Sequence, residues 1–133
     1  MGLAKQIGID KLIVPHKADQ GDSDCHCGSS DRALFHETVG DHLPDIGKHS
    51  VHIVTQPDDS AVAHYHKILS ETYVFIECGE GAGIELDGET YPVEPLTRVC
   101  IPPGVRHRVR GCAKFLVVVI PGHRESKDDD YFD

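Results

Sequence analysis

The segment His64-Tyr65-His66-Lys67-Ile68-Leu69-Ser70-Glu71 places two histidines and a carboxylate close together in the chain. In an extended strand, successive side chains point to opposite faces, so His64 and His66 share one face and Tyr65 takes the other. Glu71 then opens an apolar run, residues 72–78, that has the composition of a strand. The segment therefore predicts polar side chains gathered on the inner face of a sheet.

A second histidine segment, Pro102-Pro103-Gly104-Val105-Arg106-His107, lies further along the chain. Inward and outward positions alternate strictly here, with Val105, His107 and Val109 set against Arg106, Arg108 and Arg110. This alternation predicts a strand whose imidazole faces the interior while the arginines face outward. For the arginine row, a solvated or subunit-facing stripe with acidic partners is favoured over an anion-binding site.

Together the two segments supply three imidazoles and one carboxylate on inward faces. The predicted ligands are His64, His66, Glu71 and His107. Nitrogen and oxygen donors of this kind suit one divalent transition metal, with Fe, Mn, Ni, Zn and Cu all compatible. The alternative, four satisfied core polar groups, is disfavoured because buried polar groups that converge need a shared partner.

Two of these residues are also candidates for catalysis. Glu71 is predicted as a metal ligand or, in an enzyme, as a general base. In a strand without a bulge, Tyr73, Phe75 and Glu77 share the face of Glu71 and line the interior. Tyr73 is the candidate for orienting a substrate oxygen, while simple core filling remains the alternative for both aromatic residues.

Length and charge narrow the classes of protein. A chain of 133 residues is expected to form one domain, residues 1–133. Its net charge of −9 argues against nucleic acid as a partner. No apolar run is long enough to span a membrane and no signal-like segment is apparent, so a cytoplasmic protein is expected. Five cysteines in dissimilar contexts argue against a disulfide framework.

Outside the two histidine segments, the first half of the chain is predicted to alternate between strands and loops. Strands are expected at residues 10–14, 33–39 and 49–56, with a polar loop at 17–31. Within that loop, Cys25-His26-Cys27 is interpreted as exposed rather than as a second metal site, because no Cys-x-x-Cys partner follows. His52 is predicted as a half-exposed strand histidine, with a position near the metal as the alternative.

Turn signals and apolar runs shape the second half. Leu86-Asp87-Gly88-Glu89 predicts a two-residue hairpin, and residues 115–120 predict one buried strand. The charged tail, residues 123–133, is predicted to be loose, with docking through Tyr131 and Phe132 as the alternative. Many short strands without an amphipathic helix indicate an all-β barrel or double sheet.

The two histidine segments resemble the paired motifs of the cupin superfamily. His64, His66, Glu71 and His107 match its metal-ligand positions, and Pro102 and Gly104 match the turn before the last ligand. The resemblance covers residues 50–120 and implies a small single-domain cupin with a double-stranded β-helix (jelly-roll) barrel. Glycines of the family pattern are replaced at Asp58 and Leu96, its closing Asn is Gly111, and the Gly after Glu71 arrives late, as Gly79.

A metal-dependent enzyme acting on a small molecule is the expected function. The resemblance leaves two reaction types open, a dioxygenase and a sugar-type isomerase or lyase. A noncatalytic cupin that binds a sugar-like ligand is the alternative, and a storage-like structural barrel is the third class. Val74 and Ile76 lie opposite Glu71 on the strand, so an apolar outer face is expected to pair two copies into a homodimer.

Overall fold

The computed structural model describes residues 2–9, 24–26, 29–35, 49–120 and 129–133. Its elements are a short helix, α1 (Leu3–Ile7), and nine strands: β1 (Asp24–His26), β2 (Ser29–Phe35), β3 (Ser50–Gln56), β4 (Ser70–Cys78), β5 (Gly83–Leu86), β6 (Glu89–Pro92), β7 (Arg98–Ile101), β8 (His107–Arg110) and β9 (Ala113–Ile120). The all-β prediction is confirmed.

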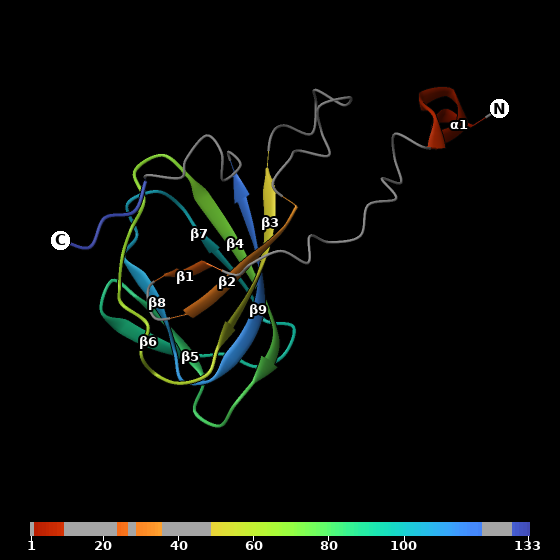
Figure 1. Cartoon of the computed structure of the whole chain (residues 1–133). Helices are drawn as coiled ribbons and strands as arrows, with labels where there is room; N and C mark the ends of the chain where they lie inside the picture. The colour runs from red at the N-terminus through yellow and green to blue at the C-terminus, as the bar shows by residue number, and fades with distance from the viewer. Residues whose placement is uncertain (1, 10–23, 27–28, 36–48, 121–128) are drawn as a thin grey trace.

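The strands form two antiparallel sheets that face each other (Figure 1). The larger sheet has the order β1-β2-β3-β9-β4-β7, and the smaller sheet has the order β6-β5-β8. Neighbours in these sheets are often distant in sequence, as where β9 lies between β3 and β4. This arrangement matches the predicted jelly-roll barrel, in which two antiparallel sheets enclose one core.

Strand β9 aligns the interior residues of the larger sheet in rows. Ser50 pairs with Val119, which pairs with Glu71 on the other side. Two residues further along each strand, His52 pairs with Val117, which pairs with Tyr73. Because side chains of paired residues point to the same face, each row crosses the inner wall of the barrel. Polar groups therefore gather at the end of the wall that carries Glu71.

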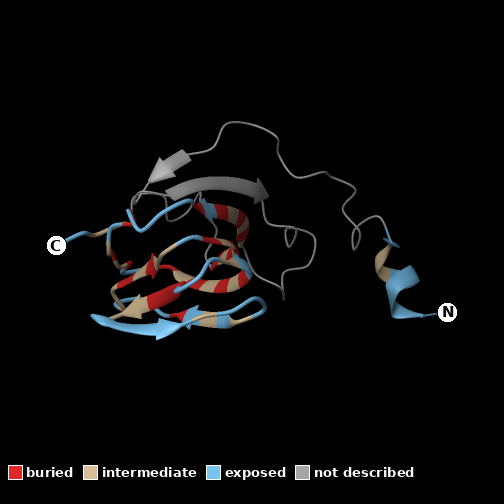
Figure 2. Ribbon diagram, turned by 90° about the horizontal axis from the view of Figure 1, so that it is seen from below, coloured by how far each residue is buried: buried red, intermediate tan, exposed pale blue. Residues whose placement is uncertain are grey.

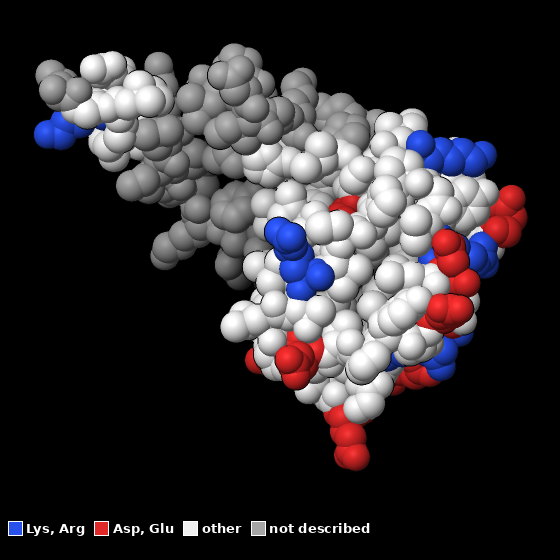
Figure 3. Space-filling model, turned by 180° about the vertical axis from the view of Figure 1, so that it is seen from behind, with Lys and Arg blue, Asp and Glu red and all other residues white. Residues whose placement is uncertain are grey.

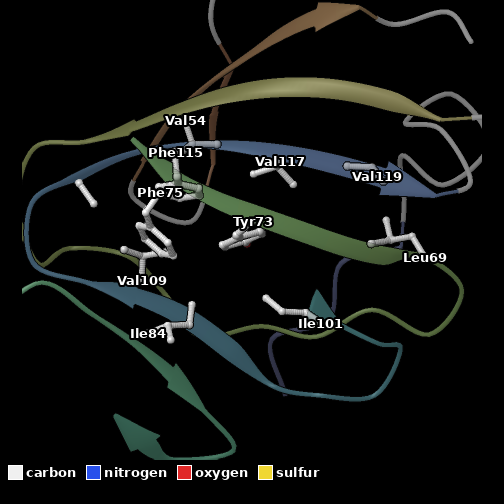
Figure 4. Close-up of a cluster of buried hydrophobic side chains, with 11 residues drawn as sticks. Val54, Leu69, Tyr73, Phe75, Ile84, Ile101, Val109, Phe115, Val117 and Val119 are labelled. Carbon is white, nitrogen blue, oxygen red and sulfur yellow. The ribbon is translucent and has the colours of Figure 1, made fainter. Parts of the chain in front are cut away.

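Beyond the row that carries Glu71, the interior of the barrel is apolar. Tyr73 and Phe115 stack with ring centroids 4.8 Å apart, and Phe75 lies 5.2 Å from Phe115. Figure 4 shows these rings meeting Ile84 and Val109 from the smaller sheet. Buried and more exposed residues alternate along the strands, whereas β6 is exposed throughout (Figure 2). Packing in this core fixes the positions of the strands that carry the polar residues.

Two local features fix how the strands are connected. The amide of Gln56 donates to the carbonyl oxygens of Val109 and Gly111 at 2.8 and 2.7 Å, linking β3 to β8 and the turn after it. The predicted hairpin is confirmed, since Asp87 and Gly88 form the turn between β5 and β6 with φ of 49° and 89°. Positive φ at both central residues is what a tight hairpin of this twist requires.

Several sequence expectations need correction. Residues 24–26 and 29–31 lie in β1 and β2 rather than in a loop, because pairing of β2 with β3 stabilises an extended backbone. Cys25 and His26 are thus strand residues, and Cys27 lies outside the described residues. His52 is buried and donates to or accepts from the Ser50 hydroxyl at 2.9 Å, so the half-exposed prediction is wrong.

Other predicted segments can be compared only in part. The strand expected at 33–39 coincides with β2 as far as Phe35, and β3 confirms the strand expected at 49–56. The expected strand at 10–14 and the first part of the tail, residues 123–128, lie outside the described residues. Strand β9 confirms the strand expected at 115–120 and begins slightly earlier, at Ala113, but the expectation of full burial is wrong, because only the inward face is buried.

Candidate metal centre

Backbone hydrogen bonds bring the two histidine segments together. The amide of His64 donates to the carbonyl of His107 at 3.1 Å, and the amide of His107 donates back to His64 at 2.8 Å. The Gly104 amide donates to the carbonyl of His66 at 2.7 Å, with Gly104 at φ 91°. This positive φ explains the glycine, because residues with a Cβ adopt that backbone conformation only with strain.

The first segment is less regular than predicted. His64 and Tyr65 form isolated bridges, and regular strand begins only at Ser70. The predicted alternation nevertheless holds, because His64 and His66 are buried while Tyr65 between them is half-buried. Strand-like geometry over these few residues is enough to aim both imidazoles inward.

Each imidazole is oriented by its Nδ1 atom, which lies within hydrogen-bond distance of a backbone carbonyl. The acceptors are Val62 for His64 at 3.1 Å, Asp129 for His66 at 2.8 Å and Val105 for His107 at 2.8 Å. A carbonyl oxygen only accepts, so Nδ1 carries the proton in each ring. In the neutral tautomer, Nε2 then presents a lone pair, as a metal ligand must.

The remaining donor atoms converge on one point. Ligand atoms of His64, His66, Glu71 and His107 all lie within 4.8 Å of one another. Ligands on opposite sides of a metal with bonds of about 2.1 Å are about 4.2 Å apart, so small adjustments would complete the shell. Among the described residues, the buried side-chain atoms without a hydrogen-bond partner are Nε2 of His66 and of His107.

Charge explains why this cluster needs a cation. Oxygen Oε1 of Glu71 contacts Nε2 of His66 and lies 3.5 Å from Nε2 of His107. If every imidazole were neutral, these lone pairs would face a carboxylate with nothing positive between them. Either a proton or a metal ion must therefore occupy the centre, and the four donors fit a divalent transition metal.

The pKa values of the cluster indicate that, without a metal ion, a proton on His66 supplies the positive charge at the centre. Burial alone would lower the pKa of His66, but the nearby carboxylates of Asp130 and Glu71 outweigh burial and raise that pKa to about 10. Burial would raise the pKa of Glu71, yet the imidazoles of His107 and His66 beside it hold that pKa well below its usual range. Burial and the neighbouring His107 lower the pKa of His64 to about 4.

The structure places the second catalytic candidate beside the ligands. Tyr73 is buried next to Glu71 on β4, and its ring centroid lies 6.0 Å from that of His107. Phe75 is fully buried on the same face. Glu77 is exposed instead, because the pairing of β4 with β9 shifts register between Phe75 and Glu77. The expectation that Glu77 lines the interior is therefore wrong.

Two aspartates that sequence reasoning missed complete the surroundings of His66. The Asp129 carboxylate is buried and accepts the backbone amides of Lys67, Ile68 and Leu69 at 2.7–3.0 Å. Asp130 places Oδ1 3.0 Å from Nδ1 of His66. The prediction of a loose tail is therefore wrong for residues 129–133, which are docked, and Tyr131, one of the two residues offered as alternative anchors, pairs with Tyr65.

The arginine row has the acidic partners that were expected. Arg108 donates to Glu85 at 2.6 Å, and Arg110 holds both carboxylate oxygens of Asp59 at 2.8–2.9 Å. Arg106 donates to the backbone carbonyls of Phe132 and Asp133. Acidic and basic side chains lie beside one another along one edge of the molecule (Figure 3).

Within the described residues, no helix is long and apolar enough to cross a membrane.

The fold is a cupin-like β-barrel, and it carries a candidate His₃Glu metal centre. No family model matches the sequence, and no curated protein matches it either. Among solved structures, a protein from Planctomyces limnophilus is similar at 28% identity and a TM-score of 0.74, over 89% of this chain and 96% of that chain.

Two further similar structures carry names. Pac13 from Streptomyces, described as a nucleoside dehydratase, has 18% identity and a TM-score of 0.66 over 89% of this chain and 90% of its own. KdgF from a Halomonas species has 13% identity and a TM-score of 0.64 over 83% of this chain and 98% of its own. At these identities the likeness shows the fold alone.

Proposed function

We propose that this protein is a metal-dependent enzyme of the lyase or isomerase type, acting on a small oxygen-rich molecule. The observation that carries the proposal is the convergence of four donor atoms within 4.8 Å. The imidazole rings are already turned by backbone carbonyls so that their lone pairs face the centre. A ligand set oriented in advance in this way binds a metal without reorganising the chain.

The chain's own residues have distinct proposed roles. His64, His66 and His107 hold the metal, and Glu71 contributes a negative charge that favours harder dications. When bound, the metal supplies Lewis acidity that polarises a carbonyl or hydroxyl oxygen. Tyr73, buried beside His107, is the proposed residue that orients the substrate oxygen, and Glu71 is the general base if it is released from ligation.

Similarity to Pac13 supports the proposed reaction class, but the proposal rests on the four donor atoms. Pac13 is described as a nucleoside dehydratase, and structures of its variants contain uridine. Dehydration next to a carbonyl needs a polarised oxygen, a base for the carbon-bound proton and an acid for the departing hydroxide. The proposed centre offers the first, and Glu71 and Tyr73 are the ionisable groups nearest to it on β4.

Domain organisation and assembly are proposed on the same basis. The barrel and its docked tail are proposed to form one domain that works as a homodimer. The outer face of the larger sheet carries Val74, Leu116 and Val118, all half-buried, with Ile76 and Ile120 more exposed at 38% and 53%. An apolar face of this kind is stabilised when a second copy covers it. A cytoplasmic location stays a prediction.

Metal analysis followed by assays tests the proposed function. The untagged protein should contain close to one transition metal per chain, and a chelator should remove both the metal and the activity. Activity would be sought by NMR with sugars and nucleosides that carry a hydroxyl group two carbons from a carbonyl. Iron with oxygen uptake would instead indicate a dioxygenase, and tight ligand binding without turnover would indicate a binding protein.

A further inference from the structure

The segment Asp129–Asp133 lies against the ligand segment through a dense set of contacts. Tyr131 and Tyr65 exchange two backbone hydrogen bonds of 2.9 and 3.0 Å, and their rings stack with centroids 5.5 Å apart. The ammonium of Lys67 lies 4.1 Å from the centre of the Tyr131 ring. The tail thus pairs like a short strand with the residues that carry His64 and His66.

Asp129 acts on the backbone that follows His66. Its carboxylate, 3% exposed, accepts three consecutive amides, those of Lys67, Ile68 and Leu69. Ionised acceptors make hydrogen bonds roughly twice as strong as neutral ones, so this contact holds the chain between His66 and β4 in one conformation.

Asp130 acts on the ring of His66 itself. Its Oδ1 and the backbone carbonyl of Asp129 both face Nδ1 of His66, at 3.0 and 2.8 Å. A carboxylate on the far nitrogen of a ligating histidine fixes the tautomer and makes the ligating nitrogen a better donor. Among the described residues, Asp130 is the one whose carboxylate approaches the Nδ1 side of a ligand histidine.

The far end of the tail is held independently of the ligands. Arg106 donates to the carbonyls of Phe132 and Asp133 at 3.0 and 2.6 Å, and the Tyr65 hydroxyl donates to the Asp133 carboxylate at 3.2 Å. The Phe132 ring, 5.7 Å from the His64 ring, covers that ligand from outside. Contacts at both ends therefore hold Asp129 and Asp130 in register with the ligand segment.

We propose that residues Asp129–Asp133 complete the metal centre, and that Asp129 and Asp130 are positioning residues that set metal affinity. The inference rests on the proposed metal site and deepens it. Binding of metal and docking of the tail are then coupled, and the coupling is reciprocal. Loss of the docked tail would weaken metal binding, and bound metal would in turn stabilise the docked conformation of the tail.

Co²⁺ affinity measures the first half of the coupling. Co²⁺ is the probe because its visible spectrum reports coordination and its affinity for nitrogen and oxygen ligands exceeds that of Mn²⁺ or Fe²⁺. Asp130→Asn should weaken Co²⁺ binding about 10- to 100-fold, the range for second-sphere partners of ligands. Asp58→Asn makes the same chemical change at an exposed position outside the tail and should alter affinity less than about twofold.

Two more variants strengthen the test. Asp129→Asn, which replaces one acceptor oxygen by a donor, and a chain ending at residue 128 should both weaken Co²⁺ binding at least as much as Asp130→Asn. Melting of each metal-free variant shows whether the barrel folds, and Asp130→Asn, which keeps the shape of the side chain, tests the inference even if the shortened chain does not fold.

Hydrogen exchange measures the reciprocal half. Addition of Co²⁺ should slow exchange at the amides of Tyr131 and Leu69, which are bonded to Tyr65 and Asp129. In Asp130→Asn this extra protection should fall by the factor by which affinity falls. Unchanged affinity in Asp130→Asn, or no change in Tyr131 exchange on adding Co²⁺, overturns the inference alone. Failure of the parent protein to bind Co²⁺ overturns it together with the proposed function.

Discussion

At the scale of single residues, the candidate site is defined by which nitrogen of each imidazole is free to bind. Backbone carbonyls beside Nδ1 of His64, His66 and His107 leave Nε2 as the inward atom in every ring. For His64 and His107 the acceptor of the Nδ1 proton is a carbonyl two residues earlier in the chain, that of Val62 and Val105 respectively. The tautomer of these two rings is therefore set by the local backbone rather than by a distant side chain. Ligand orientation is therefore a property of the extended backbone at these positions.

Substitution of the ligands is the direct check. His107→Ala should abolish stoichiometric metal, and Glu71→Gln should lower metal affinity at least about tenfold, because the neutral amide no longer offsets the charge of the dication. Glu77→Gln, the same change at an exposed position of β4, is the matched control and should bind metal normally. Element analysis and competition with a chelator give the values, and full occupancy in His107→Ala would contradict the site.

Proton release on metal binding is a second prediction at this scale. The metal-free His66 has a pKa of about 10, whereas in the unfolded chain an imidazole titrates near about 6.5. Since the folded-state pKa is raised, protonated His66 stabilises the metal-free fold fully below the unfolded value, and this contribution is lost as pH rises through about 10. At neutral pH the metal must therefore displace this proton.

Calorimetry in buffers of different ionisation enthalpy should show release of about one proton per metal at pH 7. His64, with a pKa of about 4, is already neutral there and contributes none. The rise in Tm caused by metal should grow with pH between about 6 and about 9, as proton competition weakens. A metal-induced rise that is independent of pH would show that His66 is not a ligand.

At the scale of elements, the barrel is polar at one end and apolar at the other because its strands keep one register. The row of Ser50, Val119 and Glu71 lies beside the ligands, and the row of Val54, Phe115 and Phe75 lies two steps away in the core. A slip of one residue would turn Glu71 and Tyr73 outward. The long central strand β9, paired on both sides, is what sets this register.

Gln56 is the residue that joins β3 to the smaller sheet. Gln56→Leu keeps the approximate volume but removes hydrogen bonds to the carbonyls of Val109 and Gly111, so the free energy of unfolding should fall by about 1–3 kcal/mol. Thr55→Val, at the exposed neighbouring position, should be close to neutral. Urea denaturation of both variants without metal measures the difference, and equal midpoints would show that the link does not stabilise the barrel.

At the scale of the whole molecule, the proposed homodimer would cover the outer face of the larger sheet. Light scattering at micromolar concentration should give twice the chain mass if two copies cover this face. Val118→Glu, at a half-buried outward position of β9, should shift the protein toward monomer while leaving the inner wall intact. A clean monomer mass for the parent protein would contradict the proposed homodimer.

Much of this architecture can be predicted from local patterns in the sequence. The period of two along strands predicts the inward ligands and the outward arginines, and Asp87-Gly88 predicts its hairpin from backbone conformation alone. The ligand types themselves, three imidazoles and a carboxylate, indicate a transition metal before any fold is known. These features depend on neighbours in the chain, so the sequence by itself determines them.

Other features depend on residues far away in the chain, and only the tertiary structure decided them. The shift of register after Phe75 turns Glu77 outward, pairing with β3 makes β2 a strand, and packing buries His52 inside the wall. Asp129 and Asp130 belong to the tail that was predicted to be loose, and their partners, three backbone amides and one imidazole, come from a distant segment. A side chain's role changes when a distant segment satisfies its hydrogen bonds or charge, and local patterns carry no information about which segment that is.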